Sequence, residues 1–228
     1  MSPRLLLERL QAAYGPQGWW PGDDAFEIAV GAILTQRTSW RNAALGIANL
    51  RAACILEPAA LLRCGETRLQ SLLRPCGFFR LKAGRVREFC RWLQSAGGMA
   101  TLRGLPTPVL RRALLAVHGI GPETADAILL YAFGRPVFVA DAYAFRVLGR
   151  LGLIGLRPRP DYEALRRQIE PPLGGDCAAL NELHALIVRH GQAVCRPVPR
   201  CSRCALRDDC AYARAGARQS QRATTMQA

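Results

Sequence analysis

The chain has 228 residues, half of them hydrophobic, so it is long enough to bury a sizeable core without disulfide staples. Its 31 lysines and arginines against 17 aspartates and glutamates give a formal net charge of +14, which favours a polyanionic partner such as nucleic acid. An arginine-rich genome would also raise the basic count. No apolar stretch of about 18 residues indicates a membrane span, and no signal peptide is recognised, so a reducing cytoplasm is the expected compartment.

Hydrophobic periodicity is helical throughout, without convincing period-two alternation, and predicts an all-α protein. Asp24 with Glu27 forms a capping box that begins a helix through Leu34. Ser39 caps a second helix that runs to about Arg51. Further helices are predicted at residues 58–62, 67–73 and 79–95.

Residues 117–122 join two more predicted helices through a turn in which Gly119 and Gly121 flank one apolar residue. This pattern is typical of a helix-hairpin-helix. Glycines bring the backbone close to a ligand, and the N–H groups of the helix that begins at Pro122 favour a phosphate. Gly119, Gly121 and Thr124 are therefore candidate DNA contacts, although a two-glycine turn also occurs as a purely structural connection.

After the hairpin, residues 135–136 break the helix and an extended apolar stretch at 137–140 follows. Asp141 is then placed to cap a helix through about Arg150. Two later helices are predicted at 162–170 and 177–190, and residues 213–228 are predicted to form a disordered tail.

Four of the nine cysteines, Cys195, Cys201, Cys204 and Cys210, are spaced C-x5-C-x2-C-x5-C. In a reducing compartment this crowding indicates metal ligation rather than disulfides. Four thiolates accept zinc or an iron–sulfur cluster, and the single C-x2-C pair favours the cluster. The remaining cysteines are predicted to be ordinary buried thiols: Cys54, Cys64, Cys76, Cys90 and Cys177.

Residues 114–146 together with the four cysteines resemble the endonuclease III group of helix-hairpin-helix DNA glycosylases, over about residues 19 to 210. The resemblance implies two helical lobes flanking a DNA-binding cleft and a [4Fe-4S] cluster on the four cysteines. One lobe would be a helical bundle of residues 26–136, and the other would combine 1–25 with 137–212. The first cysteine spacing is one residue shorter than the usual C-x6-C of that group.

In that group a catalytic aspartate follows the hairpin in a Val-Asp-Thr-His-like segment, which residues 140–143 match. The resemblance therefore implies that Asp141 is catalytic. A carboxylate suits this chemistry because breaking an N-glycosidic bond builds positive charge on the sugar, which a carboxylate stabilises while it orients water. The alternative role for Asp141 is a simple helix cap.

Members of the group that also cut the strand place a lysine in the helix after the hairpin. Glu123 occupies that position here, and Lys82, the only lysine, matches a different helix. A carboxylate does not form the imine that strand cleavage needs, so the resemblance implies base release by water alone, without lyase activity. Glu123 either assists in the pocket or only favours the helix dipole.

A second block resembles the bacterial 3-methyladenine glycosylases of the same superfamily, through segments 19–21, 31–36 and 38–40. The resemblance implies that Trp19, Trp20 and Trp40 line the pocket for a flipped base, unless they are core residues. Aromatic rings suit an alkylated, cationic purine. Gln36 matches the residue that fills the gap left by the extruded base; otherwise it is a polar residue at a helix end.

The expected function is a monofunctional, monomeric glycosylase that binds double-stranded DNA in the bacterial cytoplasm, at the nucleoid, and removes an alkylated purine such as 3-methyladenine. The first alternative is a glycosylase for uracil or thymine mismatches or for oxidised pyrimidines. The second is a non-catalytic DNA-binding or iron–sulfur sensor protein. Opposite-base preference and the redox behaviour of the cluster are left undecided by the sequence.

Overall fold

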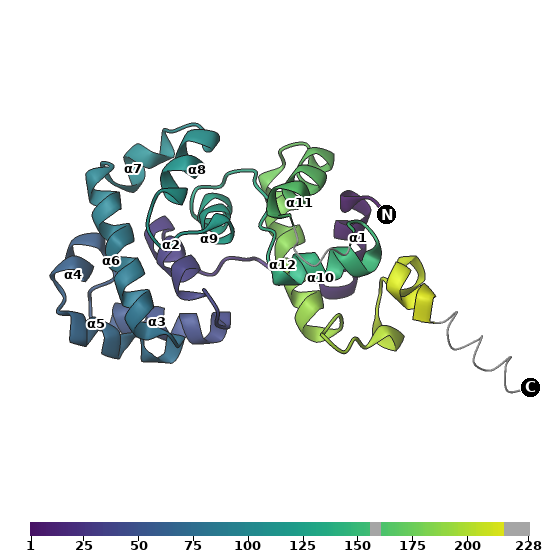
Figure 1. Ribbon diagram of the computed structural model, residues 1–228, viewed down its shortest axis with the longest axis horizontal. Helices are drawn as coiled ribbons and strands as arrows, with labels where there is room; N and C mark the ends of the chain where they lie inside the picture. Colours follow the sequence, from purple (N-terminus) through teal and green to yellow (C-terminus); the bar gives the residue numbers. More distant parts are fainter. Residues whose placement is uncertain (156–160, 217–228) are drawn as a thin grey trace, which may run out of the picture. The chain divides into compact units, whose positions relative to one another are not determined.

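The computed structural model describes residues 1–155 and 161–216, and every regular element in these ranges is helical (Figure 1). The all-α prediction is confirmed. Contacts divide the chain into a central unit, residues 20–135, and a terminal unit, residues 1–19 with 136–228. These units differ from the predicted lobes mainly in residues 20–25, which belong to the central unit. Within the described ranges, no helix has the length and apolar character needed to cross a bilayer.

The central unit is built around α2 (Ala25–Leu34), which contacts four other helical elements of the unit (Figure 1). Asp24 caps α2 by accepting from the Glu27 N–H, and Ser39 caps the next helix by accepting from the Asn42 N–H, as their sequence positions predict. The other elements of the unit are α3 (Trp40–Ala52), α4 (Pro58–Arg63), α5 (Glu66–Leu72), η1 (Arg74–Cys76), α6 (Phe79–Ser95), α7 (Gly98–Arg103), α8 (Thr107–Leu115), α9 (Pro122–Ala127) and the π-helical η2 (Ile128–Ala132).

The terminal unit is organised by α12 (Cys177–Ala193), which packs against α1 (Pro3–Tyr14) and α10 (Ala142–Leu151). Its three later α-helices each begin after an aspartate whose side chain accepts from the third N–H of the helix. The remaining elements are α11 (Tyr162–Ile169), η3 (Pro171–Leu173), η4 (Cys201–Arg203) and η5 (Arg207–Asp209).

Several features differ from the sequence-based expectations. The first helix, α1, was not predicted, although Ser2 caps it and Pro3 begins it. Residues 211–216 are helical, which differs from the predicted disordered tail over its first residues, and positions 217–228 lie outside the described residues. The prediction that Cys54 is buried is wrong: it is exposed with φ +54 because it lies in the turn after α3.

Candidate functional site

Two of the three predicted pocket tryptophans come together in the central unit. The rings of Trp20 and Trp40 meet edge to face with centroids 4.8 Å apart, and Tyr131 of η2 lies 5.1 Å from Trp20. A Cβ atom on Gly31 would lie 3.3 Å from both indoles, so the absence of a side chain there makes room for the rings. The result is a half-buried aromatic cluster of the kind that binds a flat base. Sequence reasoning missed Tyr131, because its place beside Trp20 depends on tertiary packing.

Trp19 is half-buried and is assigned by its contacts to the terminal unit. Its predicted place in the pocket therefore stays a prediction.

The hairpin lies between α8, which ends at Leu115, and α9, which begins at Pro122. Gly119 has φ +87, in the left-handed region that glycine favours, whereas Gly121 has φ −91 and ψ 179, which any residue adopts. The two glycines are therefore not equivalent: the backbone requires glycine at 119 only.

A polar network holds the hairpin to the rest of the central unit. The Gln36 side-chain amide donates to the carbonyl oxygen of Gly119 at 3.0 Å and to the Thr124 hydroxyl at 2.9 Å. Arg85 of α6 donates to the Gln36 side-chain oxygen, and its aliphatic stem packs on Gly119. Gln36 and the buried Thr124, which were predicted to contact DNA, thus satisfy one another inside the protein.

The structure places Glu123 and Lys82, the two residues compared with the lysine of strand-cutting relatives, in different surroundings. Glu123 is exposed in the first turn of α9. Lys82 is only 1 % exposed, its ammonium donates to the carbonyl oxygen of Cys76 at 2.6 Å, and burial lowers its pKa. The ammonium of Lys82 is therefore enclosed by α6 and η1 rather than presented to a substrate.

Asp141 is the N-cap of α10 in the terminal unit. Its Oδ1 accepts from the Ala144 N–H at 2.7 Å, while Oδ2 lies 3.7 Å from Nε2 of His184. The carboxylate is 14 % exposed and the imidazole 8 %. One oxygen is thus used by the helix, and the other faces a buried histidine, so Asp141 is more than an ordinary surface cap. Sequence reasoning missed His184, which comes from α12.

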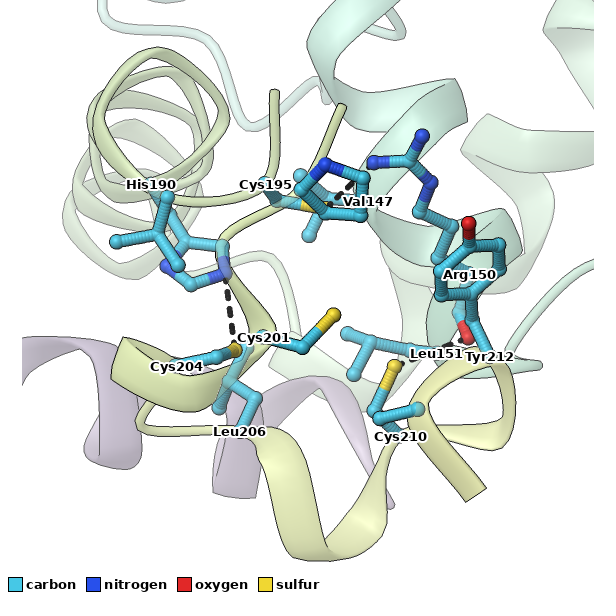
Figure 2. A pocket seen from close by; sticks show the side chains of 13 residues that line it. Val147, Arg150, Leu151, His190, Cys195, Cys201, Cys204, Leu206, Cys210 and Tyr212 are labelled. Carbon is cyan, nitrogen blue, oxygen red and sulfur yellow. Dashed lines mark hydrogen bonds between the residues drawn. The ribbon is translucent and has the colours of Figure 1, made fainter. Parts of the chain in front are cut away.

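The four cysteines of the C-x5-C-x2-C-x5-C pattern line one pocket of the terminal unit, which is partly open to solvent. Figure 2 shows the sulfur atoms of Cys201 and Cys210 pointing into it. Its walls include the apolar side chains of Val147, Leu151 and Leu206. Within the described ranges, no group of three or more His, Cys, Asp or Glu side chains meets closely enough to hold a single metal ion.

Side-chain nitrogen atoms of Arg150 and His190 lie close to two of these sulfur atoms (Figure 2). The Arg150 guanidinium lies 3.5 Å from Cys195 Sγ, and Nε2 of His190 lies 3.6 Å from Cys204 Sγ. On its other side, Nδ1 of His190 lies 2.8 Å from the Tyr14 hydroxyl. Burial lowers the pKa of His190 to about 4.

The terminal unit also gathers positive charge beside the cysteine loop, residues 195–210. Four arginines and Tyr14 line a second, open pocket, and this concentration of guanidinium groups suits phosphate oxygens. The arginines are Arg189, Arg196, Arg200 and Arg203.

Two strained, exposed residues of the central unit also escaped sequence reasoning. Arg37 has φ +55 between α2 and α3, and Phe78 has φ +45 at the start of α6 with 60 % of its surface exposed. Bulky side chains in left-handed conformation are rare and concentrate at functional sites. An exposed aromatic residue is also the kind of side chain that DNA-bending proteins insert between bases.

Comparison with known proteins gives a consistent result. The profile of the family described as HhH-GPD superfamily base excision DNA repair protein matches residues 30–173. The chain is 40% identical over 200 residues to "Putative DNA repair glycosylase MJ1434" of Methanocaldococcus jannaschii, covering 86% of this chain and 90% of that protein. It is 28% identical to endonuclease III of Thermotoga maritima, covering 84% of each.

Among solved structures, the chain is similar to the H. pylori 3-methyladenine DNA glycosylase MagIII bound to 1,N6-ethenoadenine, with a TM-score of 0.74 and 26% identity. That similarity covers 84% of this chain and 98% of the H. pylori protein.

Proposed function

The chain belongs to the HhH-GPD superfamily of base excision DNA repair proteins, and we propose that it is a monofunctional DNA glycosylase. It hydrolyses the bond between a flipped, damaged base and its sugar in double-stranded DNA and leaves an abasic site. The observation that carries this proposal is the second oxygen of Asp141, which the cap of α10 leaves available beside His184.

Asp141 would act on the sugar. As the base departs, positive charge develops at the anomeric carbon, and a carboxylate held at a fixed place stabilises it more than mobile water does. Because Oδ1 accepts from the Ala144 N–H, Oδ2, which lies beside His184, is the oxygen that would act on the substrate or its water. Water then attacks the same carbon.

Lyase activity is not expected, because the chain offers no amine for it. Lys82 is the only lysine and is buried against Cys76. Glu123 stands where the strand-cutting relatives place their lysine. We therefore expect no enzyme–DNA adduct after borohydride treatment; an adduct formed by the wild-type protein would contradict a monofunctional mechanism.

An alkylated purine such as 3-methyladenine is the proposed substrate. The edge-to-face rings of Trp20 and Trp40, with Tyr131 beside them, offer electron-rich faces to a cationic base. The similarity to the H. pylori 3-methyladenine glycosylase supports this choice, and the alternative remains a glycosylase for uracil or thymine mismatches or for oxidised pyrimidines. Trp19 is a third candidate tryptophan for the base pocket.

The duplex would be held by the hairpin and by the arginines around the cysteine loop. Gly119 and Gly121 allow the backbone N–H groups at the start of α9 to reach a phosphate. Thr124 and Gln36 support the hairpin from within, so their effect on DNA is proposed to be indirect. The exposed Arg37, next in sequence to Gln36, is then the more accessible side chain for the gap left by the base.

The four cysteines would hold a [4Fe-4S] cluster. Thiols that surround a common space without meeting at one point fit a cluster of several iron atoms better than one zinc ion. When bound, the cluster would supply a structural cross-link between the segments that carry its ligands. We propose a monomer, because each unit contains its own core.

The decisive experiment compares Asp141→Asn with Asp176→Asn. Both aspartates cap a helix through the same bond, and asparagine keeps that bond, so folding is matched. In single-turnover assays on a panel of single-lesion duplexes, Asp141→Asn should release base at least about 100-fold more slowly with unchanged duplex binding. Asp176→Asn should match the wild type.

Each outcome separates the rival functions. Full activity of Asp141→Asn would refute the mechanism. Release of only uracil, mismatched thymine or oxidised pyrimidines would move the substrate to the alternative class. A wild-type protein that binds every duplex and releases no base would be a non-catalytic DNA-binding protein.

A further inference from the structure

The environment of Cys204 contains a three-residue chain that the proposed repair reaction does not use. The Tyr14 hydroxyl at the end of α1 meets Nδ1 of His190 at 2.8 Å, and Nε2 of the same ring meets Cys204 Sγ at 3.6 Å. His190 is 1 % exposed, and its ring meets the Tyr14 ring edge to face with centroids 5.8 Å apart. Figure 2 shows His190 beside Cys204, and the contact of His190 with Tyr14 adds a third segment that is distant in sequence.

We infer that His190 donates a hydrogen bond to the cluster ligand Cys204 and that Tyr14 fixes the imidazole in the tautomer that donates. This inference rests on the proposed cluster. It assigns to two residues outside the cysteine pattern a role in tuning and retaining that cluster.

The positions of the hydrogen atoms follow from the chemistry of the ligand. A cysteine that ligates iron is a thiolate and has no hydrogen to donate. The hydrogen in the contact with Cys204 must therefore lie on Nε2 of His190. With that hydrogen on Nε2, Nδ1 is the acceptor of the second contact, and the hydroxyl of Tyr14 is the donor that meets it.

The four proposed cysteine ligands therefore differ in the hydrogen bonds that their sulfur atoms make. Cys195 receives a donor from Arg150 and Cys204 receives one from His190. Cys210 instead contacts the carbonyl oxygen of Arg150 at 3.3 Å, a contact that requires a thiol hydrogen and is lost on ligation. Hydrogen bonds to a cluster sulfur stabilise its negative charge and raise the reduction potential. Removing the His190 donor should therefore make the potential more negative and expose Cys204 to exchange.

The test uses the full-length protein purified with its iron. His190→Leu removes the donor, His190→Gln restores an N–H on a side chain of similar reach, and Tyr14→Phe removes only one hydroxyl. Tyr212→Phe is the matched control, because Tyr212 lines the cysteine pocket and contacts Arg150 through its ring alone. The readouts are iron and sulfide content, the midpoint potential by protein-film voltammetry, and the rate at which the visible cluster absorption fades in air.

His190→Leu should give a more negative potential and faster fading than the control, Tyr14→Phe a smaller change in the same direction, and His190→Gln a partial recovery. Circular dichroism checks the helical content of each variant, and only folded variants are compared. If His190→Leu does not fold, the comparison of Tyr14→Phe with Tyr212→Phe tests the inference. A Tyr14→Phe protein identical to Tyr212→Phe in potential and fading would overturn the inference and leave the cluster proposal standing. Wild-type protein without iron and sulfide would overturn both.

Discussion

Replacing Gly119 with alanine tests the asymmetry of the hairpin. The residue has φ +87, and an added Cβ atom would lie 2.6 Å from Cγ and 2.9 Å from Cδ of Arg85. Carbon atoms pack at about 3.5–4.0 Å, so the arginine stem must retreat by about 1 Å. The left-handed backbone costs about 1–2 kcal/mol for a residue with a Cβ, and loss of the Arg85–Gln36 bond costs about 1 kcal/mol.

The free energy of unfolding should therefore fall by about 2–3 kcal/mol, which lowers the melting temperature by about 4–12 °C for a chain of this size. Gly121→Ala is the matched control for stability alone, because Gly121 has φ −91 and nothing within 4 Å of the added atom. Scanning calorimetry gives both melting temperatures, and fluorescence anisotropy gives the affinity for duplex DNA. We expect Gly119→Ala to weaken both stability and binding.

A double mutant separates the cost of the left-handed backbone from the cost of the clash with Arg85. In an Arg85→Ala background the side-chain clash is gone, so Gly119→Ala should cost only the backbone share, about 1–2 kcal/mol. Equal melting temperatures for the two single glycine variants would refute the reasoning, as would a Gly119→Ala cost that does not change when Arg85 is removed.

Three further predictions follow from contacts in the central unit. Arg111→Met removes two hydrogen bonds to the fully buried Asp126 carboxylate and should cost about 3–5 kcal/mol in urea unfolding, whereas exposed Arg112→Met should cost little. Gly31→Ala presses on both indoles and should slow release of the damaged base by about tenfold or more in single-turnover assays, with melting temperature as the control for folding. Burial raises the pKa of Cys90 to about 12, so its thiol stays protonated at neutral pH and peptide mass spectrometry should find iodoacetamide on exposed Cys54 well before Cys90.

Local signals in the sequence were sufficient for most helices. The helix at 79–95 has the predicted bounds, because an amphipathic repeat ends at two glycines whose backbones have positive φ. The aspartate at 141 was identified as a cap, and its Oδ1 accepts the expected bond. Such signals lie within a few residues of the structure they specify, so one sequence contains them.

The missed features depend on segments that meet only after folding. The π-helical turn at 128–132 follows from no local signal, yet it carries Tyr131 to Trp20. The partners of Gln36 are 83 and 88 residues away in sequence, so its role in supporting the hairpin was invisible and a DNA contact was predicted instead. The same holds for His184 beside Asp141, since nothing in α12 alone distinguishes that histidine from a core residue.

Helix α10 connects the cysteine loop to the proposed hydrolysis of the base, a reaction that involves no electron transfer. Asp141 is its N-cap, while its later residues Arg146 and Arg150 donate to the backbone carbonyls of Cys195, Arg196 and Pro197. One rigid element therefore joins the candidate catalytic carboxylate to the segment that contains the first cluster ligand. If the loop unfolds, the second half of α10 loses these partners. In the proposed glycosylase, a cluster would hold this segment in any redox state that keeps the four thiolates together, so its contribution to base release would be structural rather than one of electron transfer.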